Sequence, residues 1–228
     1  MTYLHKLLWA MTAVMLVLSV PYLLIKTGAW EPAVSNASDA SGMLPMRDPD
    51  ELPVIWQLAD FSMTNQLGRT IRRADLLGQV WVADVIFTRC PGPCLKMTRQ
   101  MSQLQAALPP RSQAQLVSLT TDPEFDTPPV LKTYAQRFGA DFNRWMFLTG
   151  SPKQVASLAI DSLKLTALGK KPEERQSPVD LFVHSTIFVV IDKHSHLRGI
   201  FETTGPGVDP VQTRHDILSA VRRLERES

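Results

Sequence analysis

Hydrophobic positions divide the chain into an apolar N-terminal segment, a polar stretch and a long region with strand-like and helix-like patterns. Residues 7–25 are almost continuously apolar, interrupted only by Thr12, Ser19 and Pro21. As a helix rising about 1.5 Å per residue, this segment can cross a hydrocarbon core of about 30 Å. We therefore predict a cytoplasmic stub and transmembrane anchor over residues 1–26. A cleaved signal peptide is the alternative, and both interpretations export the rest of the chain.

The anchor is predicted to run from the cytoplasm outward. Lys6 and Lys26 flank it symmetrically, so only the N-terminal amine favours an N-in orientation. This places the globular part on the periplasmic or extracytoplasmic side of the inner (plasma) membrane. Residues 27–51 are rich in Ser, Asn, Asp, Gly and Pro and have no hydrophobic periodicity. We expect a flexible linker there, with a root-mean-square reach of roughly 30 Å.

Residues 52–228 have the pattern of an α/β domain. Apolar runs typical of strands alternate with amphipathic segments that follow Pro93, Pro128, Pro152 and Pro210. This alternation predicts a central, mostly parallel sheet flanked by helices, with an antiparallel hairpin near the end. The expected strands are two short ones around the turn at 65–68, followed by 80–88, 115–120, 145–148, 186–191 and 197–201, and residues 169–180 are expected to form a polar loop.

Composition narrows the possible functions. The net charge is +2, with 24 basic and 22 acidic residues and no basic stripe, so no nucleic-acid partner is expected. The chain contains two cysteines, Cys90 and Cys94. A disulfide between them would close almost no loop and would add little stability, so the pair suits redox or metal chemistry better than structural cross-linking.

The two cysteines lie where a buried strand is predicted to become a helix. Unpaired N–H groups and the helix dipole at such a junction favour a thiolate, and Arg89 could strengthen that field. Positions i and i+4 share a helix face, so Cys90 and Cys94 can form a disulfide or hold one soft metal ion. The alternative is that both are buried small hydrophobes.

A metal ion would need further ligands. Among the five histidines, His184 precedes the predicted buried strand at 186–191, at an edge where strand ends and helix N-termini gather. On its own, a histidine at this position is more often a hydrogen-bonded edge residue than a ligand. Two thiolates and one imidazole suit copper as Cu(I) or Cu(II), whereas structural zinc would need a fourth ligand. Met97 and Met101 are interpreted as core residues.

The ordered motifs of the domain resemble the Sco (SenC) family of copper-binding, thioredoxin-like assembly proteins for cytochrome c oxidase. The resemblance covers about residues 60–201. It is carried by Phe61 with Asn65-Gln66-Leu67-Gly68, Asp75-Leu76-Leu77-Gly78, Phe87-Thr88-Arg89-Cys90-Pro91-Gly92-Pro93-Cys94, Thr121-Asp122-Pro123-Glu124-Phe125-Asp126-Thr127-Pro128, Leu148-Thr149-Gly150 and Val183-His184-Ser185.

The resemblance implies a thioredoxin-like fold in which Cys90, Cys94 and His184 bind one copper ion. The ion would be delivered to the copper centre of oxidase subunit II or another copper-accepting membrane protein. Alternatively, the Cys90–Cys94 dithiol would reduce the cysteines of that acceptor or of another exported target. The sequence departs from the family pattern at Gly92, Leu95 and Val183. Two further hypotheses are a peroxide-reducing redoxin and an interaction domain without metal or redox activity.

Overall fold

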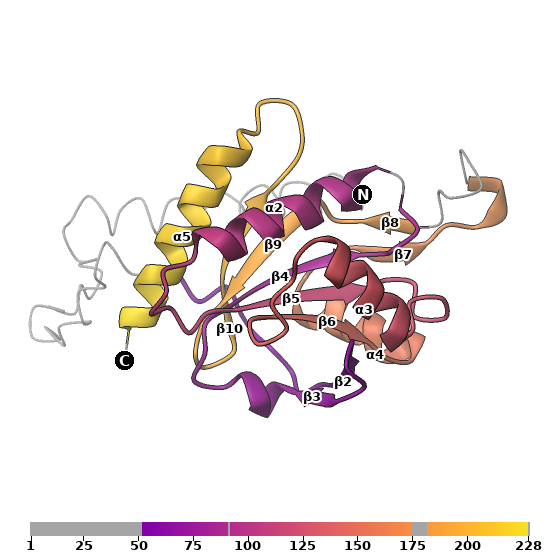
Figure 1. Ribbon diagram of the computed structural model, residues 1–228, viewed down its shortest axis with the longest axis horizontal. Helices are drawn as coiled ribbons and strands as arrows, with labels where there is room; N and C mark the ends of the chain where they lie inside the picture. Colours follow the sequence, from indigo (N-terminus) through magenta and orange to yellow (C-terminus); the bar gives the residue numbers. More distant parts are fainter. Residues whose placement is uncertain (1–51, 91, 175–181, 228) are drawn as a thin grey trace, which may run out of the picture. The chain divides into compact units, whose positions relative to one another are not determined.

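The computed structural model describes residues 52–90, 92–174 and 182–227 (Figure 1). The predicted anchor and linker, residues 1–51, lie outside the described residues. Within the described part, no helix is both long and apolar enough to span a bilayer. The strands are β1 (Trp56–Gln57), β2 (Ser62–Asn65), β3 (Thr70–Arg72), β4 (Trp81–Ile86), β5 (Gln115–Thr120), β6 (Trp145–Thr149), β7 (Ala167–Gly169), β8 (Phe182–His184), β9 (Ile187–Ile191) and β10 (His196–Glu202).

The helices begin where proline and capping signals predicted them. They are α2 (Pro93–Ala107), α3 (Pro128–Arg137), α4 (Pro152–Ala156) and α5 (Pro210–Arg226), with short helical turns at η1 (Arg73–Leu76), η2 (Ser157–Ser162) and η3 (Pro172–Glu174). At the start of α4, Ser151 Oγ accepts a hydrogen bond from the backbone N–H of Gln154 at 3.3 Å. The carboxylate of Asp209 caps α5 in the same way through Val211 N–H at 2.9 Å. These contacts satisfy amides that a helix start otherwise leaves unpaired.

The central sheet is mixed, which corrects the prediction of a mostly parallel sheet. Its strand order is β1-β10-β9-β4-β5-β6-β2-β3. Only the β4–β5 and β5–β6 pairings are parallel, whereas the other pairings in this sheet are antiparallel. The prediction failed because β9 follows a long excursion through β7 and β8 and then enters antiparallel to β4, a pairing that local periodicity does not reveal.

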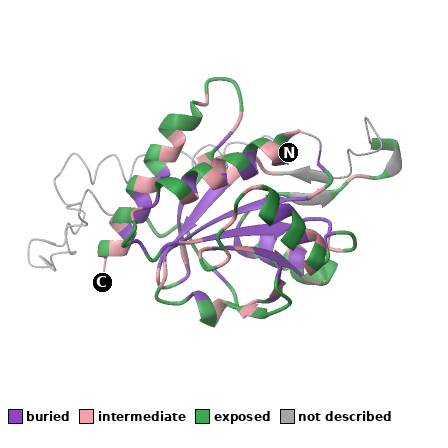
Figure 2. Ribbon diagram, viewed as in Figure 1, coloured by how far each residue is buried: buried purple, intermediate pink, exposed green. Residues whose placement is uncertain are grey.

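Helices cover both faces of the sheet, as Figure 2 shows for its buried centre. Helices α2, α3 and α5 pack on one face, where Val82, Ile86 and Leu116 point toward them. Helix α4 and the turn η1 pack on the other face, over Trp81, Ala83 and Val117. Because β4 is buried on both faces, its sequence is a nearly continuous apolar run.

The segment between β6 and β9 contains a small hairpin that the sequence did not predict. Strands β7 and β8 pair antiparallel as a separate two-stranded sheet, with Ala167 opposite His184. The polar loop predicted at 169–180 therefore begins at the end of a strand and includes η3, and residues 175–181 lie outside the described residues.

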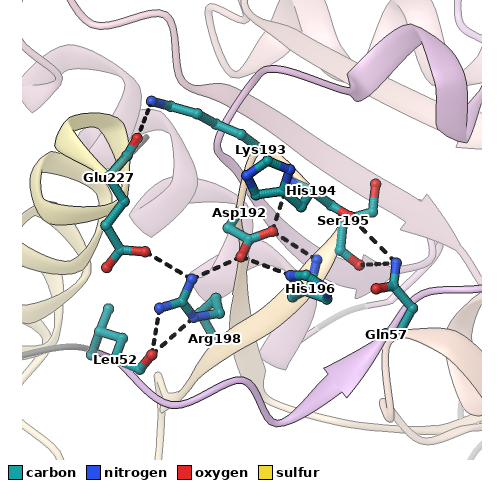
Figure 3. Close-up of polar contacts among 9 residues, drawn as sticks. All are labelled: Leu52, Gln57, Asp192, Lys193, His194, Ser195, His196, Arg198 and Glu227. Carbon is teal, nitrogen blue, oxygen red and sulfur yellow. Dashed lines mark hydrogen bonds and ion pairs between the residues drawn. The ribbon is translucent and has the colours of Figure 1, made fainter. Parts of the chain in front are cut away.

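A buried charged cluster joins the start of the described domain to its C-terminal helix (Figure 3). The Arg198 side chain is 5 % exposed, and its Nη1 donates to Asp192 Oδ2 and Glu227 Oε2, each at 2.8 Å. Its Nε and Nη2 donate to the carbonyl oxygen of Leu52. Lys193 Nζ donates to the Glu225 and Glu227 carbonyls at the end of α5.

Candidate metal and dithiol site

The two cysteines lie at the predicted strand-to-helix junction. After β4 ends at Ile86, the chain turns through a hydrogen bond from Cys90 N–H to the Phe87 carbonyl at 3.2 Å. Helix α2 then begins at Pro93, so Cys94 lies in its first turn. Proline is well suited to this position because the first helical amides lack partners within the helix. Both cysteines are reduced thiols and are buried, with Cys90 5 % and Cys94 0 % exposed.

The thiols interact with one another. A hydrogen bond with Cys90 raises the pKa of Cys94 far above its usual range, and burial and the nearby charges of Cys90 and Asp84 add to the shift. A backbone hydrogen bond from Phe87 opposes it. The helix terminus was expected to favour a thiolate, but for Cys94 this effect is outweighed by burial and by the neighbouring thiol. The Cys94 thiol therefore holds its proton until a metal or a disulfide partner displaces it.

Hydrogen bonds through Thr98 connect the start of α2 with α3. The Thr98 hydroxyl donates to the Cys94 carbonyl at 2.8 Å and lies 2.9 Å from the Tyr134 hydroxyl. Burial raises the pKa of Tyr134, with further contributions from Cys94, Asp84 and Cys90. Sequence reasoning missed Asp84, although it is the one charged residue in the apolar run of β4.

Two carboxylates from the loop between β5 and α3 hold the segment that precedes Cys90, one through its backbone and one through a side chain. Asp126 is fully buried and accepts hydrogen bonds from Thr88 N–H at 3.0 Å and from the hydroxyls of Thr88 and Thr120. Asp122 accepts a hydrogen bond from Arg89 Nε at 3.1 Å, and the two side chains form an ion pair. The sequence identified this loop as a motif but did not show that it fixes the cysteine-bearing strand end.

Arg89 has a different environment from the one expected. Its guanidinium pairs with Asp122 and lies over the Phe125 ring, 4.1 Å from the centroid. Its charge is thus directed at the loop as well as toward the cysteines. The contribution of Arg89 to a thiolate-stabilising field is correspondingly smaller than its sequence position suggests.

The backbone brings His184 toward the same edge of the sheet. Strand β9 runs antiparallel to β4, with Ala83 opposite Val189 and Trp81 opposite Ile191, so the start of β9 lies beside the end of β4. His184 ends β8, shortly before β9 begins at Ile187. The side chain of His184 is not among those described. Among the described side chains, no three His, Cys, Asp or Glu residues form a metal-binding group, so the set Cys90, Cys94 and His184 stays a prediction.

The residues predicted to be core have that role. Met97 and Met101 are fully buried in the cluster between α2 and the sheet.

Two other histidines lie away from the cysteines. His215 on α5 is two-thirds exposed. His196 contacts Asp192 through Nδ1 at 3.1 Å, within the charged cluster of the β9–β10 turn. Neither histidine lies on the β4–α2 junction.

An α/β sheet with helices on both faces and a dithiol between a central strand and its following helix defines a thioredoxin-like protein. The sequence profile of the SCO1/SenC family matches residues 56–220. The chain therefore belongs to the SCO1/SenC family.

Individual relatives agree with this assignment. The chain is 35 % identical over 141 residues to a SCO1 protein homolog of Bacillus subtilis, covering 61 % of this chain and 70 % of the relative. The solved structure of BsSco, described as a member of the Sco family of cytochrome c oxidase assembly proteins with a disulfide switch, matches with a TM-score of 0.64 and 28 % identity, covering 78 % of this chain and 98 % of BsSco. Bradyrhizobium japonicum ScoI, solved with copper bound, matches in fold with a TM-score of 0.59 and 20 % identity, covering 74 % and 99 % of the two chains.

Proposed function

We propose that this protein is a membrane-tethered copper chaperone that binds one copper ion and assists assembly of the copper centre of cytochrome c oxidase. The observation that carries the proposal is the pair of contacting, reduced thiols at the β4–α2 junction. Sulfur ligands are the ones that hold Cu(I), and an added imidazole allows Cu(II) to bind. Cys90 and Cys94 would supply the sulfurs and His184 the imidazole, with the copper ion as the transferred cargo.

Family membership supports the partner. BsSco belongs to a family of cytochrome c oxidase assembly proteins, and ScoI has been solved with copper bound. By the same relationship we propose subunit II of the oxidase, or another copper-accepting membrane protein, as the acceptor. The apolar segment at residues 7–25 would tether the domain on the extracytoplasmic face of the inner membrane, within reach of such an acceptor.

The protein around the two cysteines affects how they would bind and release a metal ion. Binding of the ion releases the proton that the Cys94 thiol holds, so the affinity depends on pH. Asp126 holds the backbone N–H of Thr88 and Asp122 holds the Arg89 side chain, and both contacts limit the movement of the segment before Cys90. Such supporting contacts orient metal ligands and commonly affect affinity by about 10–100-fold.

Copper titration of the reduced full chain tests the proposal. We expect one copper ion per chain for the wild type, at least about tenfold weaker binding for His184→Ala, and loss of the site in Cys90→Ser. His215→Ala is the matched control because this exposed histidine lies on α5. Equal affinity of the His184→Ala and wild-type proteins would exclude the three-ligand site.

A second candidate function is thiol-disulfide exchange. The same pair of reduced thiols could transfer two electrons to an acceptor disulfide, leaving a Cys90–Cys94 disulfide and two acceptor thiols. This function needs both cysteines but not His184. Exchange with a disulfide-bearing peptide that is unchanged in His184→Ala and absent in Cys90→Ser, together with sub-stoichiometric copper, would favour the oxidoreductase.

A further inference from the structure

A groove of about 470 Å³ opens beside the dithiol, between the Thr88–Arg89 backbone and helix α3. Its apolar lining includes Phe125, Pro129 and Val130, and its polar lining includes Thr88 and Arg137. Phe125 is 43 % exposed, although Arg89 lies over one side of its ring. An exposed aromatic side chain in a groove next to a reactive group is typical of a recognition surface.

The charges of the groove select one kind of ligand. Arg89 is paired with Asp122, which is buried beneath it. Arg137 is exposed in the last turn of α3, and among residues 52–90, 92–174 and 182–227 no carboxylate pairs with it. The groove therefore combines an apolar floor with one uncompensated positive charge. It fits a segment that presents an apolar side chain and a carboxylate.

The position of the groove indicates what that segment belongs to. Thr88 and Arg89 line the groove and immediately precede Cys90 in the chain. Each extended residue spans about 3.3–3.6 Å, so a polypeptide whose sulfur atoms reach Cys90 can place residues a few positions away in this groove. The groove is therefore within reach of a polypeptide that exchanges copper or electrons with the dithiol.

We propose that the groove is the docking surface for the acceptor polypeptide, and that it recognises an extended segment with an acidic and an apolar residue next to the acceptor cysteines. This inference rests on the proposed function, because it assigns the groove to the partner of that dithiol. Arg137 attracts the carboxylate, and Phe125 with Val130 holds the apolar side chain. The groove thus positions the acceptor before any metal or electron transfer.

Peptide binding tests the groove without requiring sulfur chemistry. Two short fluorescent peptides with S-methylated cysteines are compared by anisotropy on the full chain, one with Glu and Leu next to the cysteines and one with Lys and Ser. We expect the Glu/Leu peptide to bind at least about tenfold more tightly, a difference of about 1.4 kcal/mol. Its binding weakens as salt rises because the Arg137 contact is solvent-exposed.

Three variants locate the interaction. Arg137→Glu is expected to weaken the Glu/Leu peptide about tenfold and to strengthen the Lys/Ser peptide, and Phe125→Ala is expected to weaken the Glu/Leu peptide about fivefold. Arg222→Glu, a charge reversal at an exposed position on α5, is the control and should change neither peptide. Stronger binding of the Lys/Ser peptide to Arg137→Glu than to the wild type would show that the variant is folded and that the contact depends on charge.

The outcomes distinguish the docking surface from the proposed function. Equal binding of both peptides to the wild type, or equal effects of Arg137→Glu and Arg222→Glu, would overturn the docking surface even if the protein binds copper. Self-association of the chain that is lost in Phe125→Ala, without peptide discrimination, would assign the groove to a second copy and also overturn it. Selective peptide binding by a chain that binds no copper would support the groove and overturn the chaperone function.

Discussion

Replacement of Asp126 tests how strongly the loop after β5 controls the dithiol. In Asp126→Ala, the N–H of Thr88 loses its acceptor and cannot turn away, because the backbone direction is fixed by β4. A buried donor without a partner costs about 1–3 kcal/mol, and the lost carboxyl group also leaves a small void. We expect the free energy of unfolding to fall by about 3 kcal/mol.

Asp126→Asn should behave differently. Its amide oxygen can take the place of Oδ2, which accepts from Thr88 N–H and the Thr120 hydroxyl, while its NH₂ donates to the Thr88 hydroxyl. Every polar group then keeps a partner, and no charge is buried. We expect a loss within about 1 kcal/mol. Copper affinity should fall about tenfold in Asp126→Ala and stay near the wild-type value in Asp126→Asn.

The pH dependence provides an independent check. Burial raises the pKa of Asp126, although hydrogen bonds from Thr120 and Thr88 oppose the shift. A raised carboxyl pKa in the folded state stabilises the protein at pH values below the unfolded pKa of about 3.9, and this contribution is lost as pH rises through the folded value. The stability of the wild type relative to Asp126→Asn should therefore decrease as the pH rises above about 4.

Urea unfolding of the full chain, followed by the fluorescence of the buried Trp81 and Trp145, measures these differences. Copper titration of the same variants measures the effect on the site. Glu124→Ala, an exposed position in the same loop, is the control and should match the wild type. Equal losses of stability in Asp126→Ala and Asp126→Asn, or equal copper affinities of the two variants, would refute the supporting role of Asp126.

Three further predictions follow from the core and the site. Arg198→Met should lower the free energy of unfolding by roughly 3 kcal/mol, because it leaves the buried Asp192 without its cationic partner. Burial opposes a lowered pKa of Asp192, but hydrogen bonds from His196, Arg198 and His194 lower it. The stabilising contribution of Asp192 is therefore present above about pH 4 and is lost as the pH falls. Urea unfolding should show a smaller loss of stability for Arg198→Met in acid, and a loss that does not change with pH would contradict this. Because the Cys94 thiol is protonated at neutral pH, copper affinity should rise about tenfold per unit between about pH 6 and pH 8, and competition titrations that show no pH dependence would exclude proton release. Met97→Leu should cost less than about 1.5 kcal/mol and leave copper binding unchanged, whereas weakened copper binding in titration would identify Met97 as a ligand.

The β4–α2 junction that carries the cysteines was more predictable from sequence than the pairing of the sheet around it. A continuous apolar run followed by Pro93 identifies the β4–α2 junction, because strand burial and helix initiation depend on neighbouring residues. The antiparallel β4–β9 pairing depends on residues far apart in the chain and left no local signal. The hairpin of β7 and β8 was missed because its strands are short and flank a polar segment.

The contacts that support the cysteine-bearing junction were not predicted from the sequence either. Asp126 and Asp122 are polar residues in a loop, and nothing in their spacing indicates that one is fully buried beneath Thr88. Asp84 could have been noticed as a carboxylate within an apolar strand. The role of His184 depends on the orientation of its side chain, and the backbone topology shows only that β9, which begins shortly after His184, starts beside the end of β4.

The Arg198 cluster has a mechanical consequence for the proposed tether on the N-terminal side of the domain. The guanidinium holds the Leu52 carbonyl, Ile55 N–H donates to the Leu197 carbonyl in β10 at 2.8 Å, and Leu58 N–H donates to the Ser195 carbonyl just before β10 at 3.0 Å. A pull along the chain before Leu52 loads these bonds together in shear, since β1 runs alongside β10. With the proposed tether, β1 and Arg198 would therefore bear a pull on the N-terminal side, and β10 and β9 separate them from β4, the strand that precedes the dithiol.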